Sequence, residues 1–153
     1  MISQILKNNS LNKDYAVSGW VRTKRGSKHV AFIMLNDGSC LNDIQIIIED
    51  AKLLNSTVNT ISTGTSISVL GTLTKSKGQG QKVELIAKEI TVIGDADPEL
   101  YPIQPKKHSF EFLREKAHLR IRTSTISSVM RIRSILAFAI HDFFQKEGFF
   151  YVN

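Results

Sequence analysis

The sequence predicts a mainly β domain of five strands, followed by a linker and a long α-helix, and three observations support this. Between residues 14 and 94, β-branched and aromatic residues cluster in short runs separated by turn residues. The three prolines of the chain, Pro98, Pro102 and Pro105, fall in one short segment. After that segment, apolar residues recur at spacings of three and four, as on one face of a helix.

The runs predict strands at about residues 14–25, 29–35, 41–49, 65–76 and 82–94. Gly19 inside the first run indicates a bulge or a tight bend. Residues 36–39, Asn-Asp-Gly-Ser, are a strong hairpin signal, because Asp and Gly tolerate positive φ. Residues 51–60 are expected to form a short helix or an irregular connection, and residues 2–7 have the spacing of one helical turn. Five strands with a helical insertion between the third and the fourth are the element order of an OB-fold barrel.

The chain after the barrel predicts a hinge and the start of a second domain. We expect the barrel at residues 1–100, the hinge at 101–112 and the second domain at 113–153. A helix of about 20 residues or more should begin at an N-cap within 123–125 and end with Gly148 as its C′ residue. Its apolar face consists of Ile126, Val129, Ile132, Leu136, Ala139, Ile140 and Phe143. Residues 149–153 are expected to begin a strand.

Composition and charge limit the classes of protein to consider. The chain has 42% hydrophobic and 22% charged residues, as globular proteins do, and no apolar run approaches the roughly 20 residues of a membrane helix. Residues 1–14 lack the pattern of a secretory signal, and the single cysteine, Cys40, excludes an internal disulfide and a cysteine-based zinc site. These features predict a cytoplasmic protein. The net charge of +6 favours a polyanionic partner.

No group of residues predicts catalysis or metal binding. The histidines, His29, His108, His118 and His141, are far apart in the chain. Cys40 stands beside a turn with no obvious base. The Gly-Gln-Gly at residues 78–80 is not followed by the helix and the Lys-Ser pair of a phosphate-binding loop. We therefore expect no catalytic residue, no metal ligand and no cofactor in this chain.

Short motifs along the entire chain together resemble the bacterial-type asparaginyl-tRNA synthetases, class II enzymes related to the aspartyl and lysyl ones. These motifs are Gly19-Trp20-Val21-Arg22-Thr23, Leu35-Asn36-Asp37-Gly38-Ser39, Asp43-Ile44-Gln45, His108-Ser109-Phe110-Glu111-Phe112-Leu113-Arg114 and Ala117-His118-Leu119-Arg120. The asparaginyl assignment, rather than the aspartyl one, rests on residues 35–39 and on residues 101–104 with 106–108. Residues 131–152 are similar to motif 1 of the family, the long helix and strand of its dimer interface.

The resemblance implies that the chain is the anticodon-binding part of a longer enzyme, followed by the start of its class II α+β catalytic domain. The complete enzyme would attach asparagine to tRNA(Asn) with ATP and Mg²⁺, and would form a homodimer through residues 123–153. Motif 1 is incomplete at Asn153 and motifs 2 and 3 are absent, so we expect the chain alone to bind tRNA without catalysis. The alternatives are a general single-stranded nucleic-acid-binding OB protein, an aspartyl-type synthetase fragment, and a freestanding interaction module built around residues 123–153.

Reading an anticodon loop requires an aromatic face for stacking, polar groups for base edges and cations for phosphates. By resemblance, Phe32 matches the aromatic residue on which the middle anticodon base stacks; the alternative is a core residue packed with Val30 and Met34. Gln45 alternates with core-facing isoleucines, which leaves its amide on the exposed face. By resemblance, Gln45 reads the uracil at the middle position; the alternative is a solubility residue on an edge strand.

Charged residues complete the predicted binding face. Glu84 matches a family position that contacts an anticodon base, and a carboxylate near phosphates is favourable only if it accepts hydrogen bonds. By resemblance, Arg22 and Arg25 contact the anticodon stem or loop. Weaker tRNA-contact candidates are Lys24, Lys28, Lys77 and Arg120; the alternatives are ordinary solvated lysines and, for the arginine, ion pairs with nearby glutamates. Trp20, which follows the bend glycine, is expected in the core.

Overall fold

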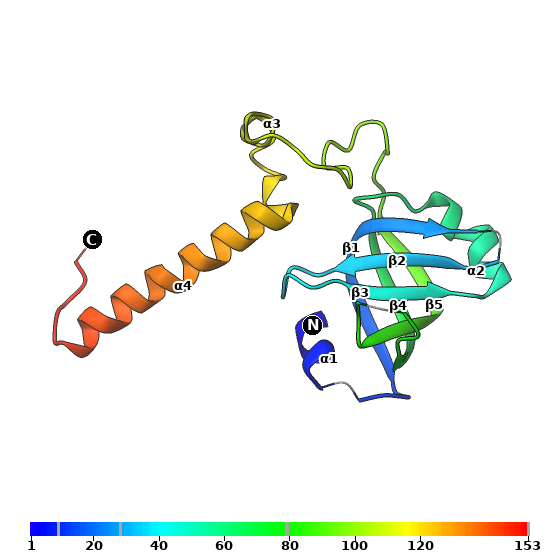
Figure 1. Ribbon diagram of the computed structural model, residues 1–153, viewed down its shortest axis with the longest axis horizontal. Coiled ribbons are helices and arrows are strands. Elements are labelled where there is room, and N and C mark those ends of the chain that lie inside the picture. Colours follow the sequence, from blue (N-terminus) through cyan, green and yellow to red (C-terminus); the bar gives the residue numbers. More distant parts are fainter. Residues whose placement is uncertain (9, 28, 79, 153) are drawn as a thin grey trace. The chain divides into compact units, whose positions relative to one another are not determined.

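The computed structural model describes residues 1–8, 10–27, 29–78 and 80–152. The chain divides into two compact units, Met1–Lys106 and Lys107–Asn153. Figure 1 labels their helices and strands.

The first unit contains a closed five-stranded β-barrel, and this confirms the predicted OB-type fold. The strands are β1 (Asp14–Gly26), β2 (Ala31–Asn36), β3 (Ile44–Ile48), β4 (Ser66–Lys75) and β5 (Val83–Gly94). Their order around the barrel is β1-β2-β3-β5-β4, with β4 returning to β1 (Figure 1). β3 and β5 run parallel, whereas the other neighbouring strands are antiparallel.

The barrel interior is filled by branched aliphatic side chains that alternate along the strands. Ile33 and Leu35 of β2 are completely buried, and so are alternate residues of β3 and β4 and Leu85 of β5. Burying each such side chain contributes roughly 1.5–3 kcal/mol. The irregularity predicted at Gly19 lies instead between Val21 and Thr23, where the β1–β2 register shifts. Gly19 serves close packing, because a Cβ there would lie 2.5 Å from the carbonyl oxygen of Asn36.

The loop after β2 is longer than the hairpin signal predicts, and it holds the first helix. β3 begins at Ile44 because the Asn36 side chain donates to the carbonyl oxygens of Cys40 and Asn42 and so fixes the loop between the strands. α1 (Ile2–Asn8) starts against this loop: its first N–H, that of Ile2, donates to Oδ2 of Asp37 at 2.8 Å. Burial raises the pKa of Asp37, but hydrogen bonds from Ser39 and from the Ile2 backbone outweigh burial and leave that pKa below its usual value.

The insertion between β3 and β4 consists of α2 (Ala51–Ser56) and the 3₁₀ helix η1 (Val58–Thr60), as the sequence predicts. Asp50 caps α2 by accepting from the N–H groups of Lys52 and Leu53 at 2.8 and 2.9 Å. Leu54 is buried in the same core cluster as the barrel interior, as are two apolar residues that follow it. The insertion therefore closes part of the core.

The proline segment contains no helix or strand, as predicted, but it is docked on the loop that precedes β4. Ser62 Oγ donates to the carbonyl oxygen of Ala96. The Tyr101 ring packs on Gly64, where a Cβ would lie 2.8 Å from the ring, and Ile103 is buried. This part of the predicted hinge is thus an integral piece of the barrel unit.

The second unit consists of α3 (Phe110–Glu115), the 3₁₀ helix η2 (Arg120–Arg122) and α4 (Ser124–Lys146). Ser109 caps α3 by accepting from the Phe112 N–H at 3.2 Å. Thr123 is the N-cap residue of α4, within the predicted range. Gly148 has φ +85 and donates to the carbonyl oxygen of Gln145, while the next N–H bonds to Phe144; this is a Schellman motif, and it confirms Gly148 as the C′ residue.

The predicted strand at residues 149–153 is wrong for the described part of that range. Residues 149–152 have no regular structure, and Asn153 lies outside the described residues. A strand requires a neighbour to bond its backbone, and no described segment pairs with residues 149–152. Within the described ranges, no helix has the length and apolar character needed to span a bilayer.

Candidate nucleic-acid interface

The predicted base-reading residues lie on neighbouring strands of the barrel. β1 pairs Arg25 with Phe32 on β2, and β2 pairs Met34 with Gln45 on β3. Gln45 in turn pairs with Glu84 on β5 through the parallel contact. Because alternate residues of these strands point into the core, the five side chains share the outer face of the barrel. We call this outer surface of β1, β2, β3 and β5 the reading face.

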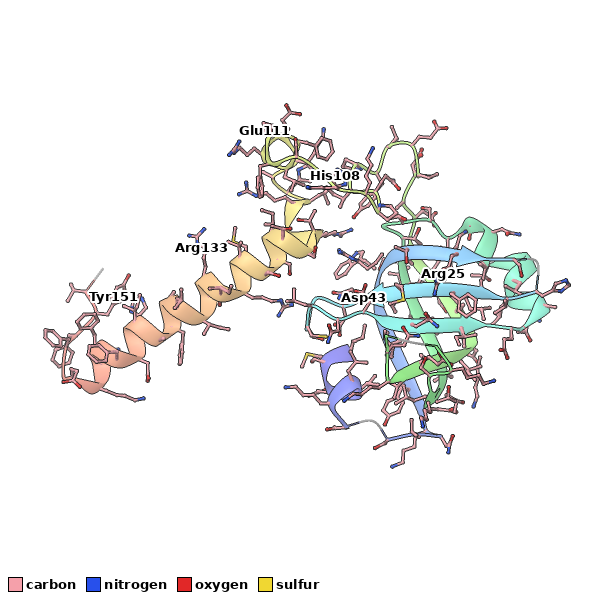
Figure 2. All side chains as sticks on the ribbon, viewed as in Figure 1. Arg25, Asp43, His108, Glu111, Arg133 and Tyr151 are labelled. Carbon is pink, nitrogen blue, oxygen red and sulfur yellow. The ribbon has the colours of Figure 1, made fainter. Side chains whose placement is uncertain are left out.

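Phe32 is half-buried and points away from the core, between the fully buried Ala31 and Ile33. This agrees with the predicted orientation and not with the alternative of a core residue. The Arg25 guanidinium lies over the Phe32 ring, 5.5 Å from its centroid, and Figure 2 shows Arg25 on the barrel. Such a cation–π contact pre-aligns a flat cation and a flat ring, both of which can stack on a nucleobase.

Gln45 lies on the predicted face but is not exposed, with only 6% of its surface accessible. The prediction of an exposed amide is therefore wrong. The amide is buried because its neighbour across the β3–β5 contact is Glu84, itself only 4% exposed, and Gln45 Nε2 donates to Glu84 Oε2 at 3.4 Å. Since a carboxylate only accepts, the amide nitrogen must face Glu84, and the amide oxygen keeps its capacity to accept.

Three further donors to Glu84 come from the turn between β4 and β5. Ser76 Oγ donates to Oε2 at 2.9 Å, the Lys77 N–H to Oε1 at 3.4 Å, and Gln81 Nε2 to Oε2 at 3.5 Å. The sequence analysis did not identify Ser76 or Gln81 as site residues. Their only sequence signal is their position beside a glycine-rich turn that joins two strands.

The predicted cations have different surroundings. Arg22 is half-buried at the register shift of β1, and Lys77 is exposed at the turn. Lys24 donates from Nζ to the carbonyl oxygen of Val58 at 2.9 Å. Although the Lys24 residue is exposed as a whole, its ammonium is partly withdrawn from water, which lowers its pKa.

Two weaker candidates, Lys28 and Arg120, stay predictions. Lys28 lies outside the described residues. Arg120 belongs to η2, in the second compact unit, and Arg114 of that unit forms an exposed ion pair with Glu111 at 3.7 Å. The ion pair with a nearby glutamate, which was the alternative for Arg120, is thus formed by Arg114.

Trp20 is not a core residue, contrary to prediction. It is 41% exposed, because β1 turns Val17 and Val21 inward and so turns Trp20 to the outer surface. Cys40 is half-buried, and its Sγ lies 3.3 Å from the carbonyl oxygen of Asn42. Over residues 1–8, 10–27, 29–78 and 80–152, no three His, Cys, Asp or Glu side chains come together as metal ligands would.

Comparison with known sequences agrees with this geometry. Residues 15–93 match the family described as OB-fold nucleic acid binding domain. The chain is 54% identical, over 152 residues, to an asparagine–tRNA ligase of Parabacteroides distasonis, an alignment that covers 99% of this chain and 32% of that protein. It is 47% identical to the asparagine–tRNA ligase of Borreliella burgdorferi, covering 99% and 33%. The chain thus spans about a third of the length of the curated relatives it matches. The predicted resemblance to asparaginyl-tRNA synthetases is confirmed.

Solved structures extend the likeness of the fold. An asparaginyl-tRNA synthetase from Pyrococcus horikoshii aligns with a TM-score of 0.83 at 22% identity, over 98% of this chain and 36% of that one. A putative aspartyl-tRNA synthetase from Leishmania major Friedlin aligns with a TM-score of 0.84 at 17% identity, over 99% and 33%. The two scores are nearly equal, so the fold does not separate the asparaginyl type from the aspartyl one.

Proposed function

Because the chain belongs to the family of OB-fold nucleic acid binding domains, we propose that its reading face binds the anticodon stem-loop of a tRNA. The complete protein would be an asparagine–tRNA ligase that joins asparagine to tRNA(Asn). The observation that carries the proposal is the placement of Phe32, Gln45 and Glu84 on the outer face of the adjacent strands β2, β3 and β5, with Arg25 over the aromatic ring.

Stacking is the first part of the proposed recognition. A base in a hairpin loop can be turned out and stacked on an aromatic side chain, which contributes about 1–3 kcal/mol per base. Phe32 is half-exposed near the start of β2, and Arg25 beside it supplies a positive charge for the RNA backbone. Arg22 and the weaker candidates Lys24, Lys28, Lys77 and Arg120 would add charge attraction to phosphates.

Base-edge reading is the second part. Gln45 has an amide oxygen that can accept and a second amide hydrogen that can donate, and the edge of uracil offers an N–H donor beside a carbonyl acceptor. Glu84 holds the Gln45 amide nitrogen on its own side, so the amide has a defined orientation. This pair would read the middle anticodon base as uracil, with Glu84 accepting from the single N–H of the base and Gln45 donating its second amide hydrogen to a carbonyl oxygen of the base.

The activity of the complete protein would need ATP and Mg²⁺. Because the chain spans about a third of the length of its curated relatives, we assign catalysis to the remainder of the protein. A homodimer through residues 123–153 is supported by the exposed apolar side chains of α4, such as Ile135 and Phe138, which are 68% and 72% accessible. The proposed location of the protein is the cytoplasm.

The experiment that tests this function compares RNA hairpins that differ only at the middle anticodon base. Gln45→Ala should weaken binding of the uracil-centred hairpin by about 1–3 kcal/mol, the usual range for a lost base contact. It should change binding of the other hairpins much less. Affinities are measured by fluorescence anisotropy at one fixed salt concentration. Gln4→Ala, at an exposed glutamine of α1, is the matched control.

The two alternative functions give different results. A general single-strand-binding protein would bind all hairpins alike, and Gln45→Ala would weaken them equally; this result would refute specific reading. An aspartyl-type protein would also prefer a central uracil, but it would favour the anticodon GUC over GUU. Comparing these two hairpins therefore tests the asparaginyl assignment separately.

A further inference from the structure

The Glu84 carboxylate is already engaged by its own chain. The four donors that the structure describes are Gln45 Nε2, Ser76 Oγ, the Lys77 N–H and Gln81 Nε2. Three of them bond to the same oxygen, Oε2, and all four are uncharged. With Glu84 at 4% exposure and Gln45 at 6%, neither group offers a base more than a small part of its surface.

The hydrogen bonds that Glu84 already accepts affect any ligand that binds to Gln45 and Glu84. A carboxylate oxygen has two acceptor lone pairs, and Oε2 of Glu84 already accepts from three donors, so a base N–H that approaches Oε2 must displace one of them. The free energy of the displaced bond is then subtracted from the free energy of binding. Stronger hydrogen bonds from the protein to Glu84 therefore weaken the binding of RNA.

Ser76 makes the shortest of these bonds. Its distance to Glu84 Oε2 is 2.9 Å, whereas the other three distances lie between 3.4 and 3.5 Å. The hydroxyl also accepts from the Gly78 N–H at 3.1 Å, which orients its own hydrogen toward the carboxylate. Ser76 directly follows the last residue of β4, and Thr74 of β4 pairs with Glu84. Ser76 can therefore release Glu84 without disturbing the barrel ladder.

We infer that Ser76 sets the affinity of the reading face by competing with the RNA base for the Glu84 carboxylate. The inference rests on the proposed function, and it adds a determinant outside the predicted reading residues. In the free chain the Ser76 hydroxyl holds Glu84 in its covered position. When RNA binds, a base N–H takes the place of the hydroxyl, and Gln45 keeps its amide nitrogen on the Glu84 side and donates its second hydrogen to the same base.

The test is the affinity of the full chain for the uracil-centred hairpin. Ser76→Ala removes the competing donor and should tighten binding roughly three- to tenfold, the range that corresponds to the net contribution of one ordinary hydrogen bond. Ser76→Thr keeps a hydroxyl and should bind like the unmodified chain. Ser18→Ala is the matched control, because the Ser18 hydroxyl bonds to Ser68 and not to a reading residue.

A double variant tests whether the gain in affinity of Ser76→Ala depends on Glu84. Ser76→Ala should give no gain in a chain that also carries Glu84→Ala, because the carboxylate for which the Ser76 hydroxyl and the base compete is then absent. Weaker binding of Ser76→Ala would mean that the hydroxyl pre-positions Glu84 for the base, and unchanged binding would mean that the bond is irrelevant; either result overturns the inference. Thermal unfolding of each variant checks that the barrel is intact.

Failure of this inference is distinguishable from failure of the proposed function. If the unmodified chain prefers the uracil-centred hairpin but Ser76→Ala does not improve it, only the role of Ser76 is refuted. If the unmodified chain has no preference for any hairpin, the proposed function is refuted and the inference falls with it.

Discussion

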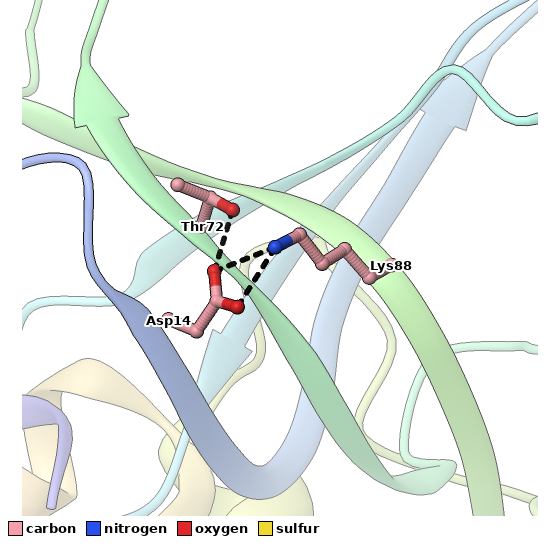
Figure 3. A network of polar contacts seen from close by, with 3 residues as sticks. All are labelled: Asp14, Thr72 and Lys88. Carbon is pink, nitrogen blue, oxygen red and sulfur yellow. Dashed lines mark hydrogen bonds and ion pairs between the residues drawn. The ribbon is translucent and has the colours of Figure 1, made fainter.

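Two carboxylates on the outside of the barrel, Asp14 and Glu84, each accept several hydrogen bonds but have opposite surroundings. Asp14 at the start of β1 accepts from Lys88 Nζ at 2.8 Å with both oxygens and from Thr72 Oγ1 at 2.7 Å (Figure 3). The Asp14 side chain is 48% accessible. Glu84 is 4% exposed, and its described donors are neutral.

The difference in exposure indicates which of the two networks stabilises the fold. Around Asp14, water can replace every partner, so the ion pair gains little over the hydrated charges. Around Glu84, the donors are covered together with the acceptor, and removing the carboxylate leaves buried amide and hydroxyl groups without a partner. The exposed network is therefore expendable, whereas the covered one contributes to stability and, in our proposal, to binding.

The largest expected effect comes from removing each carboxylate in turn. Glu84→Ala should lower the free energy of unfolding by about 2–3 kcal/mol, because the Gln45 amide loses its acceptor inside the covered site. Asp14→Ala should lower it much less, because its partners return to water. Urea unfolding of the two variants and of the unmodified chain measures the difference. Equal losses would show that burial does not separate the two networks.

A smaller effect is expected from the cation of the exposed network. Lys88→Met should reduce stability only slightly at low ionic strength, and the reduction should disappear in about 1 M salt, where the screening length is about 3 Å. Thr72 and the backbone pairing of β1 with β4 remain in this variant. Urea unfolding at both salt concentrations is the measurement. A loss that persisted at high salt would mean that the lysine packs rather than pairs.

The reading face also marks how far the sequence could predict the structure. The alternation of apolar and other residues predicted that Phe32 lies on the outer face and that Gln45 lies between two core isoleucines. This prediction needs only the neighbouring residues of the same strand, because successive side chains of a strand point to opposite faces. Alternation could not predict that Gln45 is covered, because Glu84 comes from a strand about forty positions later and Ser76 from a turn. Which face a residue occupies is a local property, whereas what covers that face depends on topology.

Local signals that were not used account for two differences from the prediction, and non-local pairing accounts for a third. α3 crosses the expected boundary between the hinge and the second domain at residue 112, although Ser109 is a suitable N-cap just before the helix. The strand expected after Gly148 has no pairing partner in the described chain, and neither composition nor β propensity can supply one. Trp20 was assigned to the core from its residue type, but the alternation of β1 turns it outward.

The smallest effect, and the most direct check of the exposed network, is the titration of Asp14. The hydrogen bond from Lys88, followed by that from Thr72, lowers the pKa of Asp14 below the usual 3.8. A lowered carboxyl pKa in the folded state stabilises the fold above pH 3.8, and this contribution is lost as the pH falls through the folded pKa. In Lys88→Met, the carboxyl pKa measured by NMR should rise toward 3.8. The stability difference between Lys88→Met and the unmodified chain should be present near neutral pH and narrow at about pH 3. A pKa that stayed low without Lys88 would assign the shift to Thr72 and remove the ion pair from the comparison.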